Sequence, residues 1–88
     1  MLGTPIQRRA RTIELIAEVI EVDASAIGAD QRLREDLGLD SLQSLELLSL
    51  LGEELRIELP MEEALDLDTV EDACAFVERN VAARSANA

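Results

Sequence analysis

The 88-residue sequence contains no histidine, lysine, tryptophan or tyrosine, and it has one cysteine, Cys74, and one phenylalanine, Phe76. Without histidine or lysine, the chain lacks the commonest general base and the amine that forms Schiff bases. One cysteine without histidine cannot complete a zinc site, and no acidic segment has the ligand spacing of a calcium-binding EF-hand loop. A single cysteine forms no internal disulfide, which is usual in a reducing cytosol. The composition therefore predicts a cytoplasmic protein that is not an enzyme and has no designed metal site.

Positive charge is also scarce, because eight arginines face nineteen aspartates and glutamates and leave a net charge of −11. Proteins that bind nucleic acids or anionic membranes need a basic face, so neither partner is expected. No apolar run reaches the roughly 20 residues of a membrane span. Hydrophobic residues nevertheless make up 48% of the chain, which is enough for a core. We expect one domain over residues 1–88, with its core at about 5–82 and a frayed tail at 83–88.

The first predicted helix begins near the N-terminus. Thr4 suits the N-cap, Pro5 suits the first helical position, and Gln7 completes the pattern of a capping box. The helical spacing of apolar residues is lost between Asp23 and Leu39, which predicts a long ordered loop. Long loops in compact domains are usually functional. Before that loop, apolar residues recur at the helical spacing of a buried stripe: Ile6, Ala10, Ile13, Ile16, Ala17 and Ile20.

A second helix is predicted from Ser41 to about Leu55, and Gly52 lies inside it at a cost of about 1 kcal/mol relative to alanine. After Pro60, which ends the preceding segment, residues 61–65 have room for one or two helical turns. The predicted buried stripe of the second helix consists of Leu42, Leu45, Leu48, Leu51 and Leu55.

The last predicted helix begins at Asp68 or Thr69, with Glu71 completing a capping box from Asp68. No segment shows the alternating pattern of a strand. The sequence therefore predicts an all-α bundle of three main helices and one short helix, with a long first loop. The stripe expected to be buried in the last helix contains Val70, Ala73, Cys74, Val77 and Val81, with Cys74 as a small core residue.

The most specific segment is Leu37-Gly38-Leu39-Asp40-Ser41-Leu42, where the long loop meets the second helix. Gly38 permits a tight turn, and Asp40 or Ser41 can cap the helix. Ser41 then lies at a helix N-terminus, where free amide groups and the helix dipole favour a negative group such as a phosphate ester. Taken alone, these residues favour a serine that only caps a helix.

The chain resembles the acyl carrier protein family over about residues 13–81. A short Asp-Ser-Leu motif alone is common by chance, but here it is in register with a proline that ends the second helix segment and a Thr-Val pair that begins the last one. The resemblance implies the all-α fold of that family. The matching segments are Asp30–Leu33, Asp36–Leu42, Glu46–Leu47, Glu53–Leu55, Ile57–Pro60 and Thr69–Ala73.

The same resemblance implies a function. Ser41 would receive 4′-phosphopantetheine from coenzyme A through a separate phosphopantetheinyl transferase with Mg²⁺, and Asp40 and Leu42 would belong to the attachment motif. The thiol of this arm would carry an acyl group as a thioester, and the chain itself, a monomer, would catalyse nothing. Acyltransferases, ketosynthases or other pathway enzymes with basic docking patches would bind around the second helix. The candidate contact residues are Asp36, Gln43, Leu45, Glu46, Glu53 and Glu54.

Three residues depart from the pattern of fatty-acid carriers. Gln43 and Gly52 stand where acids are common, and Ser49 stands where a large apolar residue is common. These differences favour a polyketide or another specialised pathway over housekeeping fatty-acid synthesis. Two alternatives stay open: a carrier of aminoacyl, aryl or peptidyl groups in a nonribosomal pathway, and an acidic helical adaptor that binds a basic partner without carrying any group.

Overall fold

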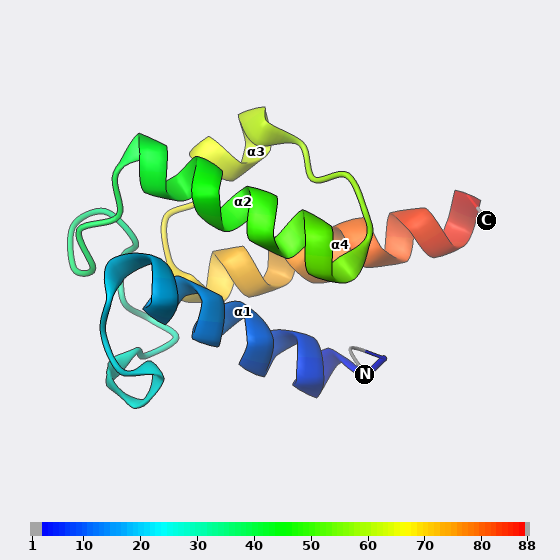
Figure 1. Ribbon diagram of the computed structural model, residues 1–88. Helices are drawn as coiled ribbons and strands as arrows, with labels where there is room; N and C mark the ends of the chain where they lie inside the picture. Colours follow the sequence, from blue (N-terminus) through cyan, green and yellow to red (C-terminus); the bar gives the residue numbers. More distant parts are fainter. Residues whose placement is uncertain (1–2, 88) are drawn as a thin grey trace.

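The computed structural model describes residues 3–87, with side chains described as far as Arg84. Apart from one isolated bridge, the described residues contain no β structure, which confirms the predicted all-α fold class. Helix α1 packs against α2 and α4, and the short α3 packs against α2 (Figure 1). In chain order the elements are α1 (Pro5–Ile20), the 3-10 turn η1 (Ala24–Ala26), α2 (Ser41–Leu55), α3 (Met61–Leu65) and α4 (Val70–Asn87).

The start of α1 matches the prediction from local sequence. The Thr4 hydroxyl accepts a hydrogen bond from the Gln7 N–H at 3.1 Å, and the Gln7 side-chain oxygen accepts one from the Thr4 N–H at 3.3 Å. Pro5 occupies the first turn, where its missing N–H costs nothing. The helix ends at Glu21, which adopts the left-handed conformation with φ 60° and lets the chain turn into the long connection.

The buried face of α1 differs from the predicted stripe. Ile6 is 81% exposed and Ala10 is also exposed, so their assignment to the core is wrong. The buried face is rotated toward Thr12 and Leu15. Thr12 can be fully buried because its hydroxyl donates to the carbonyl of Arg8 at 2.7 Å, so no polar atom is left without a partner.

In α2 the predicted stripe is also rotated. Leu42 is 68% exposed and Leu45 is 39% exposed, so the interpretation of these two residues as core is wrong. Leu51, which belongs to the predicted stripe, is buried as expected, and Leu47, which does not, is buried as well. Seven of the fifteen residues of α2 are leucines, and they lie on every side of the helix, so spacing alone could not identify the buried face.

The long connection between α1 and α2 is held against the start of α4. The Leu33 N–H donates to the Asp68 carbonyl at 2.7 Å, and the Val70 N–H donates to the Gln31 carbonyl at 3.0 Å. The Leu39 N–H donates to the Leu33 carbonyl at 2.8 Å, and both leucines are buried. This connection lies at one end of the bundle, on the left in Figure 1, and it fixes the segment that enters α2.

Gly52 in α2 is explained by the way the helix ends. Arg56 follows the helix in the left-handed conformation with φ 56°, and the Ile57 N–H donates back to the Gly52 carbonyl at 3.2 Å. A Cβ atom on Gly52 would lie 3.2 Å from the Ile57 carbonyl oxygen, closer than ordinary contact. Glycine therefore allows the chain to fold back tightly toward α3.

The capping of α4 differs from the prediction by one residue. Thr69, rather than Asp68, accepts from the Asp72 N–H at 3.1 Å, and the Asp72 carboxylate accepts from the Thr69 N–H at 3.1 Å. Glu71 takes no part in this box, because its carboxylate pairs with Arg9 of α1. The helix continues to Asn87, within the stretch where a frayed tail is expected, and that expectation stays a prediction.

The core is aliphatic around one aromatic ring, as the composition indicates. Phe76 is the largest fully buried side chain, and the buried Cys74 confirms the prediction of a small core residue. Val81 packs against this core while staying partly exposed. The principal core residues are Leu15, Ile16, Leu33, Leu39, Leu47, Leu51, Val70, Ala73, Cys74, Phe76 and Val77.

Candidate functional site

The N-terminus of α2 is fixed by a capping box that the sequence analysis did not identify. The Asp40 carboxylate accepts from the Gln43 N–H at 2.8 Å, and the Gln43 side-chain oxygen accepts from the Asp40 N–H at 3.1 Å. The Ser44 hydroxyl donates to the Asp40 carbonyl at 2.9 Å. Gly38, with φ +73°, lets the preceding chain turn. The signal was present in the sequence as an acid followed three residues later by glutamine.

Ser41 is the first residue of α2 and its side chain is exposed. Among the described residues, none forms a hydrogen bond with its hydroxyl, whereas the nearby Ser44 hydroxyl is engaged. The Gln43 amide is capped by Asp40, and the first turn contains no acidic side chain. A phosphate ester on Ser41 would therefore lie at the positive end of a 15-residue helix, in the field that favours it. The exposed hydroxyl and this helix end fit a covalent phosphopantetheine group.

Several predicted contact residues share the exposed face of α2. Leu42, Leu45 and Glu46 are exposed within the first two turns, and Glu53 is exposed near the end. Residues 42, 46, 49 and 53 are separated by four, three and four positions, so they form one stripe along the helix. The stripe is apolar near Ser41 and acidic farther along. Gln43 is half-buried and faces the start of the helix through its capping bond.

The two other predicted contact residues have partners within the chain. The exposed Asp36 carboxylate accepts from the Arg32 N–H at 2.8 Å in the loop before α2. Glu54 accepts two bonds of 2.6 Å from the guanidinium of Arg11 in α1. This fork lowers the pKa of the Glu54 carboxyl, because it stabilises the charged form. The structure therefore places three of the six predicted contact residues, Leu45, Glu46 and Glu53, on the exposed face of α2 and turns Glu54 toward α1.

An apolar cavity of about 20 Å³ lies behind α2, between it and the chain that leads from α3 into α4. This volume is near that of a single water-sized probe. The Phe76 ring forms part of the wall, and the Arg79 guanidinium lies over the same ring, 5.7 Å from its centre. The other wall residues include Leu39, Ser44, Leu47, Leu51, Ala64 and Leu67.

Helix α3, which borders this cavity, has few anchors of its own. None of its five residues is buried, and its N-terminus has no side-chain cap. Two arginines from other elements hold it: Arg34 donates to the Leu65 carbonyl at 2.5 Å, and Arg79 lies 3.5 Å from the Glu63 carboxylate. Both contacts are solvent-exposed, so each adds little to the stability of α3.

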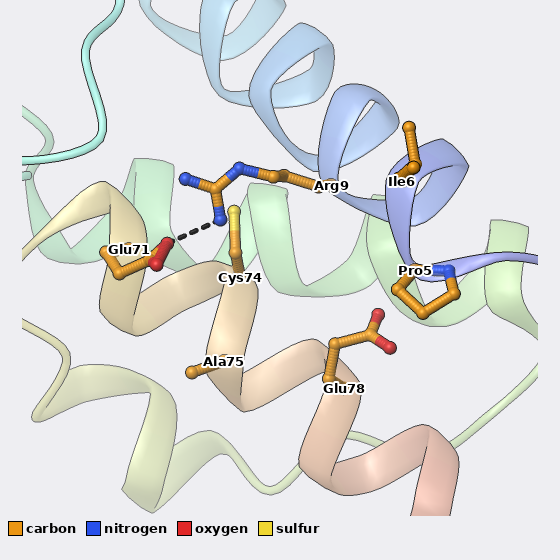
Figure 2. Close-up of a pocket in the computed structure, with 7 residues that line it drawn as sticks. All are labelled: Pro5, Ile6, Arg9, Glu71, Cys74, Ala75 and Glu78. Carbon is orange, nitrogen blue, oxygen red and sulfur yellow. Dashed lines mark hydrogen bonds and ion pairs between the residues drawn. The ribbon is translucent and has the colours of Figure 1, made fainter.

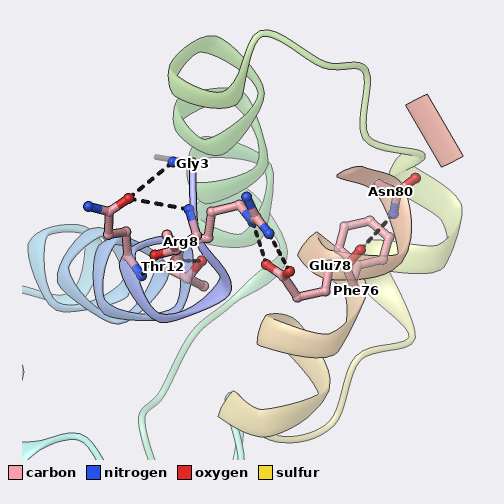
Figure 3. Close-up of polar contacts among 8 residues, drawn as sticks. Gly3, Arg8, Thr12, Phe76, Glu78 and Asn80 are labelled. Atoms are coloured by element: carbon pink, nitrogen blue, oxygen red, sulfur yellow. Dashed lines mark hydrogen bonds and ion pairs between the residues drawn. The ribbon is translucent and has the colours of Figure 1, made fainter. Parts of the chain in front are cut away.

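Arginines near the N-terminus tie α1 to the other helices. Arg8 forms a two-pronged pair with Glu78 of α4, with both nitrogen–oxygen distances at 2.7 Å (Figure 3). This pair lowers the pKa of the Glu78 carboxyl because the guanidinium stabilises its charged form. The same view shows the Thr12 bond to the Arg8 carbonyl and the Asn80 amide bonded to the Phe76 carbonyl at 2.8 Å.

A shallow hollow of about 280 Å³ lies between α1 and α4, away from Ser41 (Figure 2). Arg9 crosses it to Glu71 at 2.5 Å, and the Cys74 side chain points from α4 toward α1. Burial raises the pKa of the Cys74 thiol, so it is held as the neutral, unreactive form. The hollow is therefore a groove between α1 and α4 that the Arg9–Glu71 ion pair spans.

Within the part of the chain that the structure describes, no three His, Cys, Asp or Glu side chains gather in a way that would hold a metal ion. None of the described helices has the length and apolar character needed to cross a bilayer.

The chain matches known proteins over most of its length. Residues 10–77 match the family model described as a phosphopantetheine attachment site. The acyl carrier protein of Treponema pallidum subsp. pallidum is 42% identical over 76% of this chain and 86% of its own length. That of Helicobacter hepaticus is 41% identical over 75% and 87%, and that of Akkermansia muciniphila is 37% identical over 90% and 96%.

These matches cover most of the chain and include the turn, the capped helix start and the exposed serine described above. They confirm the predicted covalent 4′-phosphopantetheine and the prediction that the chain is a carrier rather than a catalyst. Together with the helical bundle, they show that this chain belongs to the acyl carrier protein family.

Proposed function

We propose that Ser41 carries the 4′-phosphopantetheine arm and that the chain shuttles acyl thioesters between enzymes of a specialised, polyketide-like pathway in the cytoplasm. When bound, the arm supplies a thiol that holds the acyl group. The observation that carries the attachment site is the exposed hydroxyl at the first residue of a capped 15-residue helix, within the Asp40-Ser41-Leu42 motif. Because the chain has no histidine or lysine, the base that accepts the Ser41 proton is expected to belong to the transferase.

The attachment site is tested by intact-protein mass spectrometry. The protein is incubated with coenzyme A, Mg²⁺ and a broad-specificity phosphopantetheinyl transferase, and the expected result is a gain of one phosphopantetheine. The Ser41→Ala variant should gain nothing. Ser44→Ala is the matched control, because Ser44 lies one turn away but its hydroxyl is bonded to the Asp40 carbonyl. Unmodified wild-type protein with several transferases, or modified Ser41→Ala protein, would refute the assignment.

The docking surface that we propose begins at the attachment motif and continues along the exposed face of α2. Leu42 and Leu45 provide exposed apolar area beside Ser41, and Glu46 and Glu53 provide charge farther along. Exposed apolar residues next to acids suit transient binding, since charge accelerates encounter and the small apolar contact allows release. Asp36, Asp40 and Gln43 complete the proposed surface at its loop end. The partners are a phosphopantetheinyl transferase and acyltransferases or ketosynthases with basic patches.

The proposal of a specialised pathway rests on the smaller number of acidic residues on this surface than is common in fatty-acid carriers. The side-chain oxygen of Gln43 is used in the capping box, Ser49 is small, and Gly52 is required by the tight end of α2. A ketosynthase of housekeeping fatty-acid synthesis should therefore elongate the malonyl-loaded protein at least tenfold more slowly than its own carrier. Equal elongation rates would contradict the specialised role. Loading by aminoacyl donors but not by malonyl donors would instead support the nonribosomal alternative.

A further inference from the structure

Glu53 and Glu54, two consecutive acids at the end of α2, have different surroundings. Consecutive residues of an α-helix point about 100° apart, because 3.6 residues complete a turn. Glu53 therefore shares the outward stripe with Leu42 and Glu46, whereas Glu54 lies on the side of α2 that meets α1. In agreement with this geometry, Glu54 contacts an α1 side chain, and no ion pair joins Glu53 to any described residue.

The partner of Glu54 is Arg11, whose planar guanidinium occupies both carboxylate oxygens. Its Nε and Nη2 atoms lie 2.6 Å from the two Glu54 oxygens. Its Nη1 atom lies 3.1 Å from Glu14 and 3.8 Å from Glu18, on the same face of α1. Only 32% of each side chain of the Arg11–Glu54 pair is exposed. Such a fork combines two charge-assisted hydrogen bonds in a fixed plane, which makes it stronger than an ordinary surface ion pair.

A basic side chain of an approaching protein would find both Glu54 oxygens already accepting one bond from Arg11, and it would meet the positive charge of the guanidinium. The cluster of Arg11 with Glu14, Glu18 and Glu54 still carries more negative than positive charge. It can therefore attract a basic partner from a distance without offering a contact.

We propose that Arg11 withdraws Glu54 from the docking surface, so that direct charge contacts along α2 are made by Glu46 and Glu53. This inference rests on the proposed function of α2 as the docking helix. Glu46 and Glu53 are seven residues apart, which corresponds to about 10 Å along a helix. The partner that fits this face has an apolar contact for Leu42 and two basic side chains about 10 Å apart, without a third basic group opposite Glu54.

The test measures kcat/KM for phosphopantetheine transfer to three variants that each remove one negative charge. At low ionic strength, Glu46→Gln and Glu53→Gln should each lower kcat/KM by about three- to tenfold, whereas Glu54→Gln should change it less than twofold. The three variants have the same net charge, so they serve as controls for one another. Equal effects of Glu53→Gln and Glu54→Gln, large or small, would overturn the proposal.

The Arg11→Gln variant tests the cause of the difference. Releasing Glu54 should raise kcat/KM above the wild-type value, and the rise should vanish in the Arg11→Gln/Glu54→Gln double variant. A rise that persists in the double variant would mean that Arg11 acts by its own charge and would overturn the inference. Thermal unfolding followed by circular dichroism establishes that each variant is folded at the assay temperature.

A second measurement is independent of the transfer reaction. In a carboxyl-detected NMR titration of the unmodified protein, Glu54 should titrate at lower pH in the wild type than in the Arg11→Gln variant. Identical titration of Glu54 in the two proteins would overturn the inference. Failure of the proposed function has a different signature, because the wild-type protein would then accept no phosphopantetheine while the NMR difference persisted.

Discussion

Substitutions at Asp40 separate its role in capping α2 from its role in recognition. Asp40→Ala removes the 2.8 Å bond to the Gln43 amide, and loss of such a cap costs about 1 kcal/mol. In a domain of this size that cost corresponds to a fall of about 4–8 °C in the unfolding temperature. Asn is as good an N-cap as Asp, so Asp40→Asn should lose only the charge–dipole contribution of about 0.3–1 kcal/mol. The order of stability is therefore wild type, Asp40→Asn, Asp40→Ala.

The assay is thermal and urea unfolding followed by circular dichroism at 222 nm. Glu46→Gln is the control, because it removes the same charge from the exposed face of α2 without removing a cap. Phosphopantetheine transfer should fall in both Asp40 variants, since the capping bond uses one carboxylate oxygen and leaves the other for a partner. An Asp40→Ala protein that melts within 1 °C of the wild type would refute the capping argument. Full transfer to Asp40→Asn would restrict Asp40 to a structural role.

Three further predictions concern hydrogen exchange in α3, the pH dependence of stability and the salt dependence of stability. Arg34→Ala removes the bond to the Leu65 carbonyl and should speed hydrogen exchange of α3 amides about two- to fivefold. Arg32→Ala is the control and should leave this exchange unchanged. Unchanged exchange in Arg34→Ala would contradict the prediction. The Arg8–Glu78 pair lowers the pKa of the Glu78 carboxyl. The pair therefore contributes about 0.5–1 kcal/mol to the free energy of unfolding at neutral pH, and this contribution is lost as pH falls below about 4.3. If urea unfolding gives the same difference between wild type and Glu78→Gln from pH 7 to 3, the prediction is wrong. The unfolding temperature should rise between 10 and 200 mM NaCl, because the net charge is −11 and the Debye length shortens from about 30 Å to about 7 Å. A flat or falling profile would show that the ion pairs of α1 outweigh the self-repulsion.

Features set by neighbouring residues could be predicted from the sequence. The start of α1 was correctly predicted because Thr4, Pro5 and Gln7 act within one turn. The bounds of α2 and α3 and the order of the helices were also predicted, because residues close in sequence determine where each helix begins and ends. The Asp40–Gln43 box was equally local but was not identified, although its spacing is that of the α1 box.

Features that depend on distant residues could not be predicted in this way. The ion pairs of Arg8 and Arg11 join residues 70 and 43 positions apart, and nothing in local patterning selects one acid among nineteen. The buried face of α2 was predicted only in part, with Leu51 right and Leu42 and Leu45 wrong, because the leucines surround the helix and packing against the rest of the bundle selects among them. For the site, the motif located Ser41 correctly at the start of α2, but the different surroundings of Glu53 and Glu54 required the structure.

The tight end of α2 limits how this carrier can be re-engineered. One way to test the proposed specialised role is to place an acid at Gly52, where fatty-acid carriers commonly have one. A glutamate there would bring its Cβ to 3.2 Å from the Ile57 carbonyl oxygen, so the backbone after the helix would have to shift before the new charge could be displayed. Ser49 lies on the same exposed side without that obstacle. A change of side chain is therefore coupled to backbone geometry at Gly52, whereas Ser49 is open to simple side-chain exchange.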